Sequence, residues 1–123
     1  MADKQKVLII EDDTMILDMY TLKFSQEGFE VHAAEDGQKG WDQAQSVQPD
    51  VILLDIILPE MDGFTVLKNL KGDEALKDIP VILLTNLGQD GDVKKGLELG
   101  ANDYLIKANY TPSQVLDKVK SVL

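Results

Sequence analysis

The chain has a repeating pattern in which short apolar runs alternate with longer stretches of mixed polarity. Three of the runs, Val7–Ile10, Val51–Leu54 and Val81–Leu84, contain no polar residue. Uninterrupted apolar runs of this length, bounded by turn residues, are typical of strands buried on both faces. Two further strands are predicted, one at Phe29–Ala33, where polarity alternates, and one at Asp103–Ile106.

Between and after these strands, apolar residues recur at helical spacing. The spacing predicts five helices, at Thr14–Glu27, Gly37–Val47, Phe64–Leu70, Asp90–Leu99 and Pro112–Val122. The last helix has the clearest start, because Thr111 fits the N-cap, Pro112 fits the first helical position and Gln114 completes a capping box. The fourth is weakened by Gly91 and Gly96, each costing about 1 kcal/mol relative to alanine.

A strand is followed by a helix five times, which predicts an α/β fold with a parallel sheet between two layers of helices. Right-handed crossovers with short links leave few possible arrangements of the strands. We favour a doubly wound five-stranded sheet in the order 2-1-3-4-5. No linker, repeat or low-complexity segment divides the chain, so residues 1–123 are expected to form one domain.

Composition narrows the classes of function. With 12 basic and 22 acidic residues, the formal net charge is -10, which argues against direct nucleic-acid binding. The chain contains no cysteine, which excludes disulfides and thiol chemistry. No apolar run reaches the length of a signal-peptide core or a membrane span, so we expect no membrane association and a cytoplasmic location.

Polar side chains follow four of the predicted strands. These residues are Glu11 and Asp12 after the first strand, Asp55 after the third, Thr85 after the fourth and Lys107 after the fifth. The carboxyl ends of parallel strands share one edge of a sheet, and ligands bind there where the strand order reverses. Each residue alone has an ordinary explanation as a turn cap, a helix-terminal acid or a surface lysine. Four such ends around one crevice are harder to attribute to chance.

This group of side chains suits phosphoryl transfer. Three neighbouring carboxylates are costly unless a proton is retained or a cation binds, and an all-oxygen ligand set favours a hard ion such as Mg2+. Lys107 offers a mobile positive charge for a phosphoryl group, and Thr85 offers a hydroxyl donor. Carboxylates also accept phosphoryl groups as aspartyl phosphates. Phosphoryl transfer onto one of the acids accounts for all five groups.

Together with Leu58–Gly63 and Gly100–Tyr104, these residues form an ordered set of motifs over nearly the whole chain. In this combination the chain resembles the receiver domain of two-component response regulators, which has a flavodoxin-like fold. The resemblance implies the strand order given above. It also implies a signalling module that catalyses only its own phosphorylation and dephosphorylation and that changes shape on a partner-binding face.

The resemblance assigns a role to each site residue. Asp55 would accept a phosphoryl group from the phosphohistidine of a histidine kinase or a histidine phosphotransfer protein. Lys107 would contact that group, while Thr85 and Tyr104 would form the switch that reports it to the face made by the fourth helix, fifth strand and fifth helix. The expected Mg2+ ligands are Glu11, Asp12, Asp55 and the backbone carbonyl of Ile57.

Three positions depart from the family pattern. Ala108 follows Lys107 where the family usually has a proline, often after a cis bond, and a cis bond before a non-proline residue costs about 3 kcal/mol. Ile57, two residues after the acceptor, has no polar group to orient a hydrolytic water, which predicts slow loss of the phosphoryl group. Asn86 follows Thr85 where a smaller residue is common, which narrows access for the donor.

Two other classes of function compete with this interpretation. A haloacid-dehalogenase-type phosphatase also uses a strand-end aspartate and Mg2+, but it needs a second aspartate at the position of Ile57. A flavodoxin needs a hydroxyl-rich phosphate loop after the first strand, where Glu11, Asp12 and Asp13 would repel phosphate. A receiver with no second domain must act through a downstream protein partner, unless the sequence is a fragment of a larger regulator or hybrid kinase.

Overall fold

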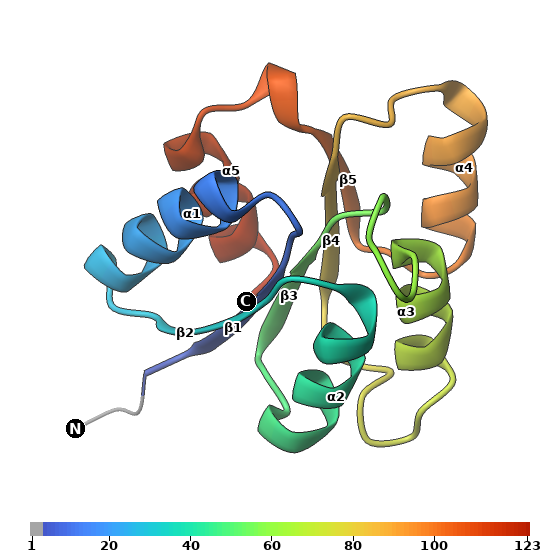
Figure 1. The fold of residues 1–123 in the computed structure, drawn as a ribbon, viewed down its shortest axis with the longest axis horizontal. Helices are drawn as coiled ribbons and strands as arrows, with labels where there is room; N and C mark the ends of the chain where they lie inside the picture. The colour runs from blue at the N-terminus through green and yellow to red at the C-terminus, as the bar shows by residue number, and fades with distance from the viewer. Residues whose placement is uncertain (1–3) are drawn as a thin grey trace.

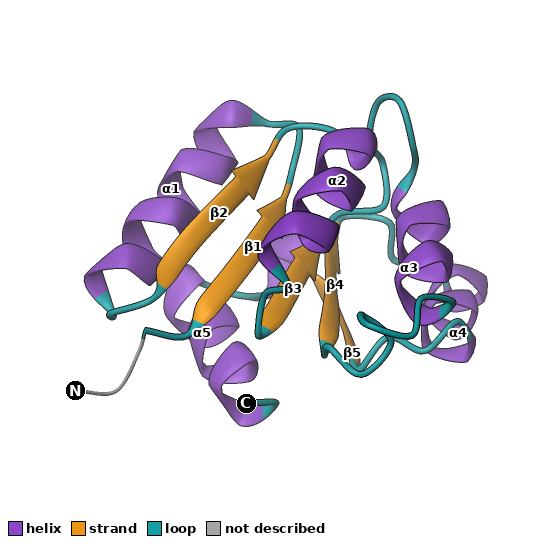
Figure 2. Ribbon diagram, turned by 90° about the horizontal axis from the view of Figure 1, so that it is seen from below, coloured by secondary structure: helices purple, strands orange, loops and turns teal. Residues whose placement is uncertain are grey.

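A computed structural model describes residues 4–123 of the chain, with a single sheet between two layers of helices (Figures 1 and 2). All neighbouring strands are parallel, and the sheet has the order β2-β1-β3-β4-β5, as predicted. The strands are β1 (Lys6–Ile10), β2 (Glu30–Ala34), β3 (Val51–Leu54), β4 (Val81–Thr85) and β5 (Asp103–Ile106).

Five helices connect and follow the strands. They are α1 (Thr14–Gln26), α2 (Gly37–Val47), α3 (Gly63–Lys71), α4 (Asp90–Glu98) and α5 (Pro112–Ser121). Helices α1 and α5 lie on one face of the sheet, while α2, α3 and α4 lie on the other (Figure 1). None of the helices within residues 4–123 combines the length and the apolar character needed to cross a lipid bilayer.

Alternate residues of the buried strands supply two separate apolar cores. In β1, Val7 and Ile9 pack with α1 and α5, whereas Leu8 and Ile10 pack with α2 and α3. Since successive side chains of a strand point to opposite faces, a run with no polar residue is required when helices cover both faces. The central strands therefore follow directly from the apolar runs of the sequence.

Aspartate side chains fix the starts of three helices at the carboxyl edge of the sheet. Asp13 caps α1, Asp36 caps α2 and Asp62 caps α3, each by accepting a hydrogen bond from a backbone N–H of the first turn. Such a cap contributes about 1 kcal/mol to stability. The predicted capping box of Thr111 and Gln114 is also present at the start of α5.

The structure differs from the sequence-based prediction in small ways. Strand β2 begins one residue later than predicted, because Phe29 instead packs edge-on against Phe24 of α1, with ring centroids 5.3 Å apart. A 3-10 turn at Lys107–Asn109, which the pattern does not predict, follows β5. Gly96 has a packing role in α4, because a Cβ there would lie 2.5 Å from a methyl group of Leu83.

Candidate functional site

The strand ends meet in one pocket at the carboxyl edge of the sheet. Because Ile10 at the end of β1 is in register with Leu54 at the end of β3, Glu11 and Asp55 leave the two strands side by side, and Thr85 is the last residue of the neighbouring strand β4. The loops that leave β1, β3, β4 and β5 gather at the upper side of Figure 1. The pocket has a volume of about 420 Å³ and is lined by Glu11, Asp12, Asp13, Ile16, Asp55, Ile57, Thr85, Asn86, Leu87 and Lys107.

Lys107 connects two acids that lie far from it in the sequence. Its ammonium lies 2.7 Å from Oδ2 of Asp55 and also forms an ion pair with Glu11. Burial alone would lower the pKa of Lys107, but hydrogen bonds to Asp55 and Glu11 outweigh burial and raise it. Lys107 is therefore held as a cation between the two carboxylates.

Backbone amides orient the two buried acids from the other side. The N–H of Ile56 donates a 2.7 Å hydrogen bond to Oδ1 of Asp55, so one oxygen of Asp55 faces the backbone and the other faces Lys107. The N–H of Asp13 donates to Oε2 of Glu11 at 3.2 Å, while the Asp13 side chain caps α1. Asp13 thus lies on the rim of the pocket as a helix cap.

Three carboxylates are close enough to share a cation. Glu11, Asp12 and Asp55 each offer one oxygen, and these oxygens lie within 4.8 Å of one another. One lysine ammonium balances only part of this charge, so the site favours a further cation, and its oxygen-only donor set is the one that Mg2+ prefers. Ile57, whose carbonyl was the fourth expected ligand, lines the same pocket. The residues present fit Mg2+.

Glu11 makes the stability of the metal-free protein depend on pH. Burial raises the pKa of Glu11 from 4.5 to about 7, against the opposing effect of the hydrogen bond from Lys107. Between these values the folded protein keeps a proton that the unfolded chain releases, so the contribution of Glu11 to the free energy of unfolding falls as the pH rises.

Urea unfolding in the presence of a chelator, at about pH 5 and about pH 7, measures this contribution. We expect the stability of the unsubstituted protein to fall relative to that of Glu11→Gln as the pH rises, because glutamine has no proton to release. Parallel pH profiles for the two proteins would contradict the assignment.

Thr85 and Tyr104 both contact the same loop residue. The hydroxyl of Thr85 accepts a hydrogen bond from the N–H of Leu87 at 3.3 Å, and the Tyr104 hydroxyl donates to the carbonyl of Leu87. Burial, together with the charges of Asp92 and Asp55, raises the pKa of Tyr104 to about 12. Leu87 links the two predicted switch residues through its backbone, which sequence patterns do not reveal.

The structure shows where the three residues that depart from the family pattern lie. The described residues contain no cis peptide bond, so the bond between Lys107 and Ala108 is trans, and Lys107 still reaches Asp55. The Ile57 side chain is 63% exposed at the pocket mouth. Asn86 also lines the pocket, on the side of the loop after β4.

The parallel sheet and the acidic pocket at its carboxyl edge together define a class of protein. The family model of the response regulator receiver domain matches residues 7–120, and the chain belongs to this family. It is therefore a signalling domain of two-component systems rather than a haloacid-dehalogenase-type phosphatase or a flavodoxin. Family members bind Mg2+ in an acidic pocket, and the cluster of Glu11, Asp12 and Asp55 corresponds to such a pocket.

Particular relatives extend the comparison. The transcriptional regulator RpaA of Synechocystis is 43% identical over 118 residues, which cover 96% of this chain and 48% of RpaA. The phosphate regulon regulator PhoB of Escherichia coli is 36% identical, with 97% of this chain and 52% of PhoB covered. The chain thus spans about half the length of these curated relatives.

Solved structures agree with the fold over nearly the whole chain. The chemotaxis protein CheY4 of Vibrio cholerae is 30% identical, with a TM-score of 0.91, and the match covers 98% of this chain and 100% of CheY4. The receiver domain of the Francisella response regulator 1452 is 29% identical, with a TM-score of 0.89, over 97% of this chain and 96% of that domain. The predicted fold is confirmed.

Proposed function

We propose that residues 1–123 act as a phosphorylatable receiver module in which Asp55 accepts the phosphoryl group. The observation that carries this proposal is the contact of Lys107 with both Asp55 and Glu11 in a pocket at the carboxyl edge of the sheet. Asp55 is buried, yet it lines an open pocket, so its carboxylate is both held in place and reachable. A nucleophile needs both properties.

The transfer is a displacement at phosphorus. A carboxylate oxygen of Asp55 forms the new P–O bond while the bond between phosphorus and the imidazole nitrogen of a phosphohistidine breaks, and the imidazole leaves with its electron pair. The ammonium of Lys107 balances the negative charge on the phosphoryl oxygens. Mg2+, held by Glu11, Asp12, Asp55 and the carbonyl of Ile57, would supply further positive charge to those oxygens.

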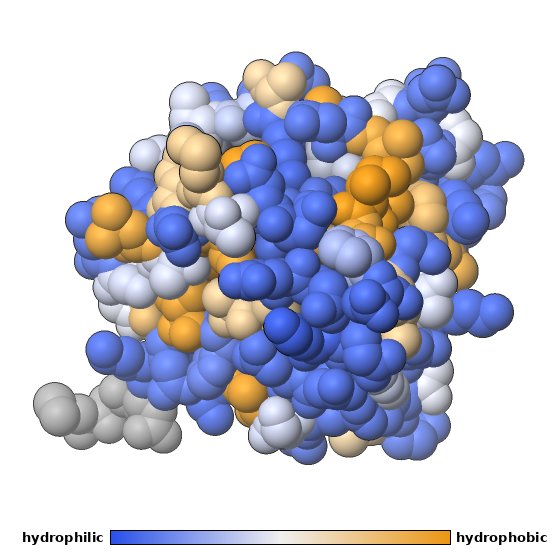
Figure 3. Space-filling model, in the orientation of Figure 1, coloured by the Kyte–Doolittle hydropathy of each residue, from blue (hydrophilic) through white to orange (hydrophobic). Residues whose placement is uncertain are grey.

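The phosphodonor would approach across the start of α1. Three apolar side chains of this helix are exposed to solvent, Met15 by 82%, Met19 by 43% and Leu22 by 61%, and Ile57 is exposed at the pocket mouth. Figure 3 shows apolar side chains over parts of α1 and beside α4 on an otherwise hydrophilic face. A histidine kinase or phosphotransfer protein with an apolar helix fits this surface, and the cytoplasm is where such a donor would meet it.

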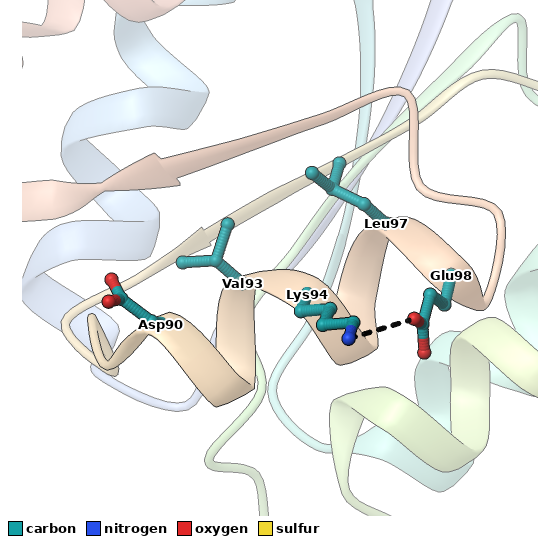
Figure 4. A pocket seen from close by; sticks show the side chains of 5 residues that line it. All are labelled: Asp90, Val93, Lys94, Leu97 and Glu98. Carbon is teal, nitrogen blue, oxygen red and sulfur yellow. Dashed lines mark ion pairs between the residues drawn. The ribbon is translucent and has the colours of Figure 1, made fainter.

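The output face is formed by α4, β5 and α5. Figure 4 shows Val93 and Leu97 of α4 on the side of β5, with Lys94 and Glu98 paired along the helix. These residues and Asp90 line a hollow of about 540 Å³, and Leu97 is 47% exposed. Tyr104 of β5 joins this face to the loop after β4, so a shift of Thr85 toward a phosphoryl group would reach a downstream protein partner through Leu87.

The proposal is tested by mass spectrometry of the intact protein. Incubation with Mg2+ and acetyl phosphate is expected to add one phosphoryl group, and the same incubation with excess chelator is expected to add none. An adduct that forms equally well without Mg2+ would contradict the metal site. A protein that gains no phosphoryl group from either acetyl phosphate or phosphoramidate would contradict the acceptor function.

Ile57 is expected to set the lifetime of the phosphorylated state. Its apolar side chain lies at the pocket mouth and cannot orient a water for attack on the phosphoryl group, so the adduct should persist on the order of minutes or longer. In Ile57→Asn the amide supplies that hydrogen bond, and we expect decay to be faster by about tenfold or more.

The lifetime is measured from the mass spectrum at intervals after removal of the donor. Ile57→Leu is the matched control, because it keeps an apolar side chain of the same size at the same place, and its adduct should decay at the original rate. A lifetime of seconds in the unsubstituted protein would contradict the role of Ile57.

A further inference from the structure

The β3–α3 loop, residues 55–62, passes directly against the first turn of α2. A Cβ added to Gly37 would lie 1.6 Å from the carbonyl oxygen of Met61 and 2.9 Å from its Cβ. The added Cβ would overlap with a backbone carbonyl, so rotation of a side chain cannot relieve the overlap. Gly37 is buried, and its N–H donates a hydrogen bond to the carbonyl of Pro59 at 3.2 Å. The loop can therefore pass this close to α2 only because residue 37 has no side chain.

The same loop contains a backbone conformation that is rare for residues other than glycine. Glu60 has φ +69°, in the left-handed region, and it stands between Pro59 and Met61, the two residues that contact Gly37. Such conformations persist only where the surroundings hold them. A further hydrogen bond joins the two ends of the loop, because the N–H of Gly63 donates to the carbonyl of Ile56 at 2.8 Å. The conformation of the loop is therefore held both where it contacts Gly37 and where its two ends meet.

We infer that Gly37 is a positioning residue for the metal site, because its missing side chain lets α2 support the loop that carries Asp55 and Ile57. This inference rests on the proposed function. With a Cβ at position 37, the loop and the start of α2 must separate until the distance from that Cβ to the Met61 carbonyl oxygen grows from 1.6 Å to at least 3.0 Å. Metal–ligand distances are held within about 0.2 Å, so the resulting displacement of the loop is large on the scale of the site.

Gly40, one turn further along α2, provides a matched control. It is also buried, and a Cβ there would lie 2.5 Å from the Cδ1 methyl of Ile10, so Gly40→Ala also crowds the packing of α2. The overlap is with an apolar side chain of β1 and not with the β3–α3 loop. Gly40→Ala crowds the side chain of Ile10, whereas Gly37→Ala crowds the backbone of the loop that carries Asp55 and Ile57, two of the four proposed ligands.

Calorimetric titration with Mg2+ tests the inference on the full chain. We expect the dissociation constant to rise by about tenfold in Gly37→Ala and to stay within about twofold in Gly40→Ala. Equal Mg2+ affinities in Gly37→Ala and the unsubstituted protein would overturn the role of Gly37 but leave the proposed metal site intact. If the unsubstituted protein binds no Mg2+, the proposed metal site fails, and this inference fails with it.

A second measurement needs no substitution and so does not depend on the folding of a variant. In a nuclear magnetic resonance titration of the unsubstituted protein with Mg2+, the amide of Gly37 is expected to shift with the same midpoint as the calorimetric binding. The amide of Gly28, which follows α1 at its other end, is the reference and should not move. A Gly37 resonance that stays in place during saturation would overturn the inference.

Discussion

Asp55→Asn is expected to remove the phosphoryl adduct completely. The neutral amide is a poor nucleophile, and it replaces the carboxylate that lies 2.7 Å from Lys107 and accepts the N–H of Ile56. The variant should fold, because asparagine has nearly the same shape and its oxygen still accepts a hydrogen bond. It also removes one negative charge from the neighbourhood of Glu11, which lessens the repulsion between the two acids.

The measurement is the intact mass after incubation with Mg2+ and acetyl phosphate. Asp62→Asn is the matched control, since Asp62 is an exposed cap of α3 in the same loop, and asparagine caps helices about as well. The control should gain one phosphoryl group at the original rate. An undiminished adduct on Asp55→Asn would place the acceptor at another residue.

Lys107→Met is expected to slow phosphorylation by about 100-fold or more, because it removes the charge that balances the transferring group. It also leaves Glu11 and Asp55 without their shared partner, which is expected to cost about 3 kcal/mol of stability in the absence of metal. Mg2+ should restore part of that stability, because it binds the same carboxylates in the folded state only.

Rates of adduct formation and urea unfolding with and without Mg2+ measure the two effects. Lys77→Met makes the same chemical change at an exposed lysine, whose partner Glu74 is 91% exposed. Surface pairs contribute about 0–1 kcal/mol, so this control should phosphorylate normally and lose little stability. A Lys107→Met variant that phosphorylates at the original rate would exclude Lys107 from the transfer.

The sequence was sufficient to predict the fold and to bring Glu11, Asp12, Asp55, Thr85 and Lys107 together at one edge of the sheet. The apolar runs ending at Ile10, Leu54 and Leu84 require a sheet covered on both faces, and the parallel connections then bring Glu11 and Asp55 to one edge. This prediction succeeded because it depends on periodicity and on the direction of the strands. The capping box of Thr111 was predictable for the same reason, since its signal is local.

Contacts between backbone and side chains of distant segments could not be predicted in this way. The hydrogen bond from the Tyr104 hydroxyl to the carbonyl of Leu87 depends on the path of a loop. Every residue has a backbone carbonyl, so the pattern of residue types cannot show which carbonyl accepts this bond. Gly96 looked unfavourable for a helix, and only its approach to Leu83 explains its presence. Nothing in the sequence distinguishes Gly37 from other glycines, because its role depends on how closely the Met61 carbonyl passes the start of α2.

The ion pairs of Lys107 join residues 96 and 52 positions away along the chain. Such distant contacts form only after long segments have closed on one another, which is a slow and cooperative part of folding. Before β5 joins the sheet, Lys107 is not at the pocket. Before β1 joins it, Glu11 is not at the pocket. The proposed phosphorylation site is therefore assembled only in the completed native state.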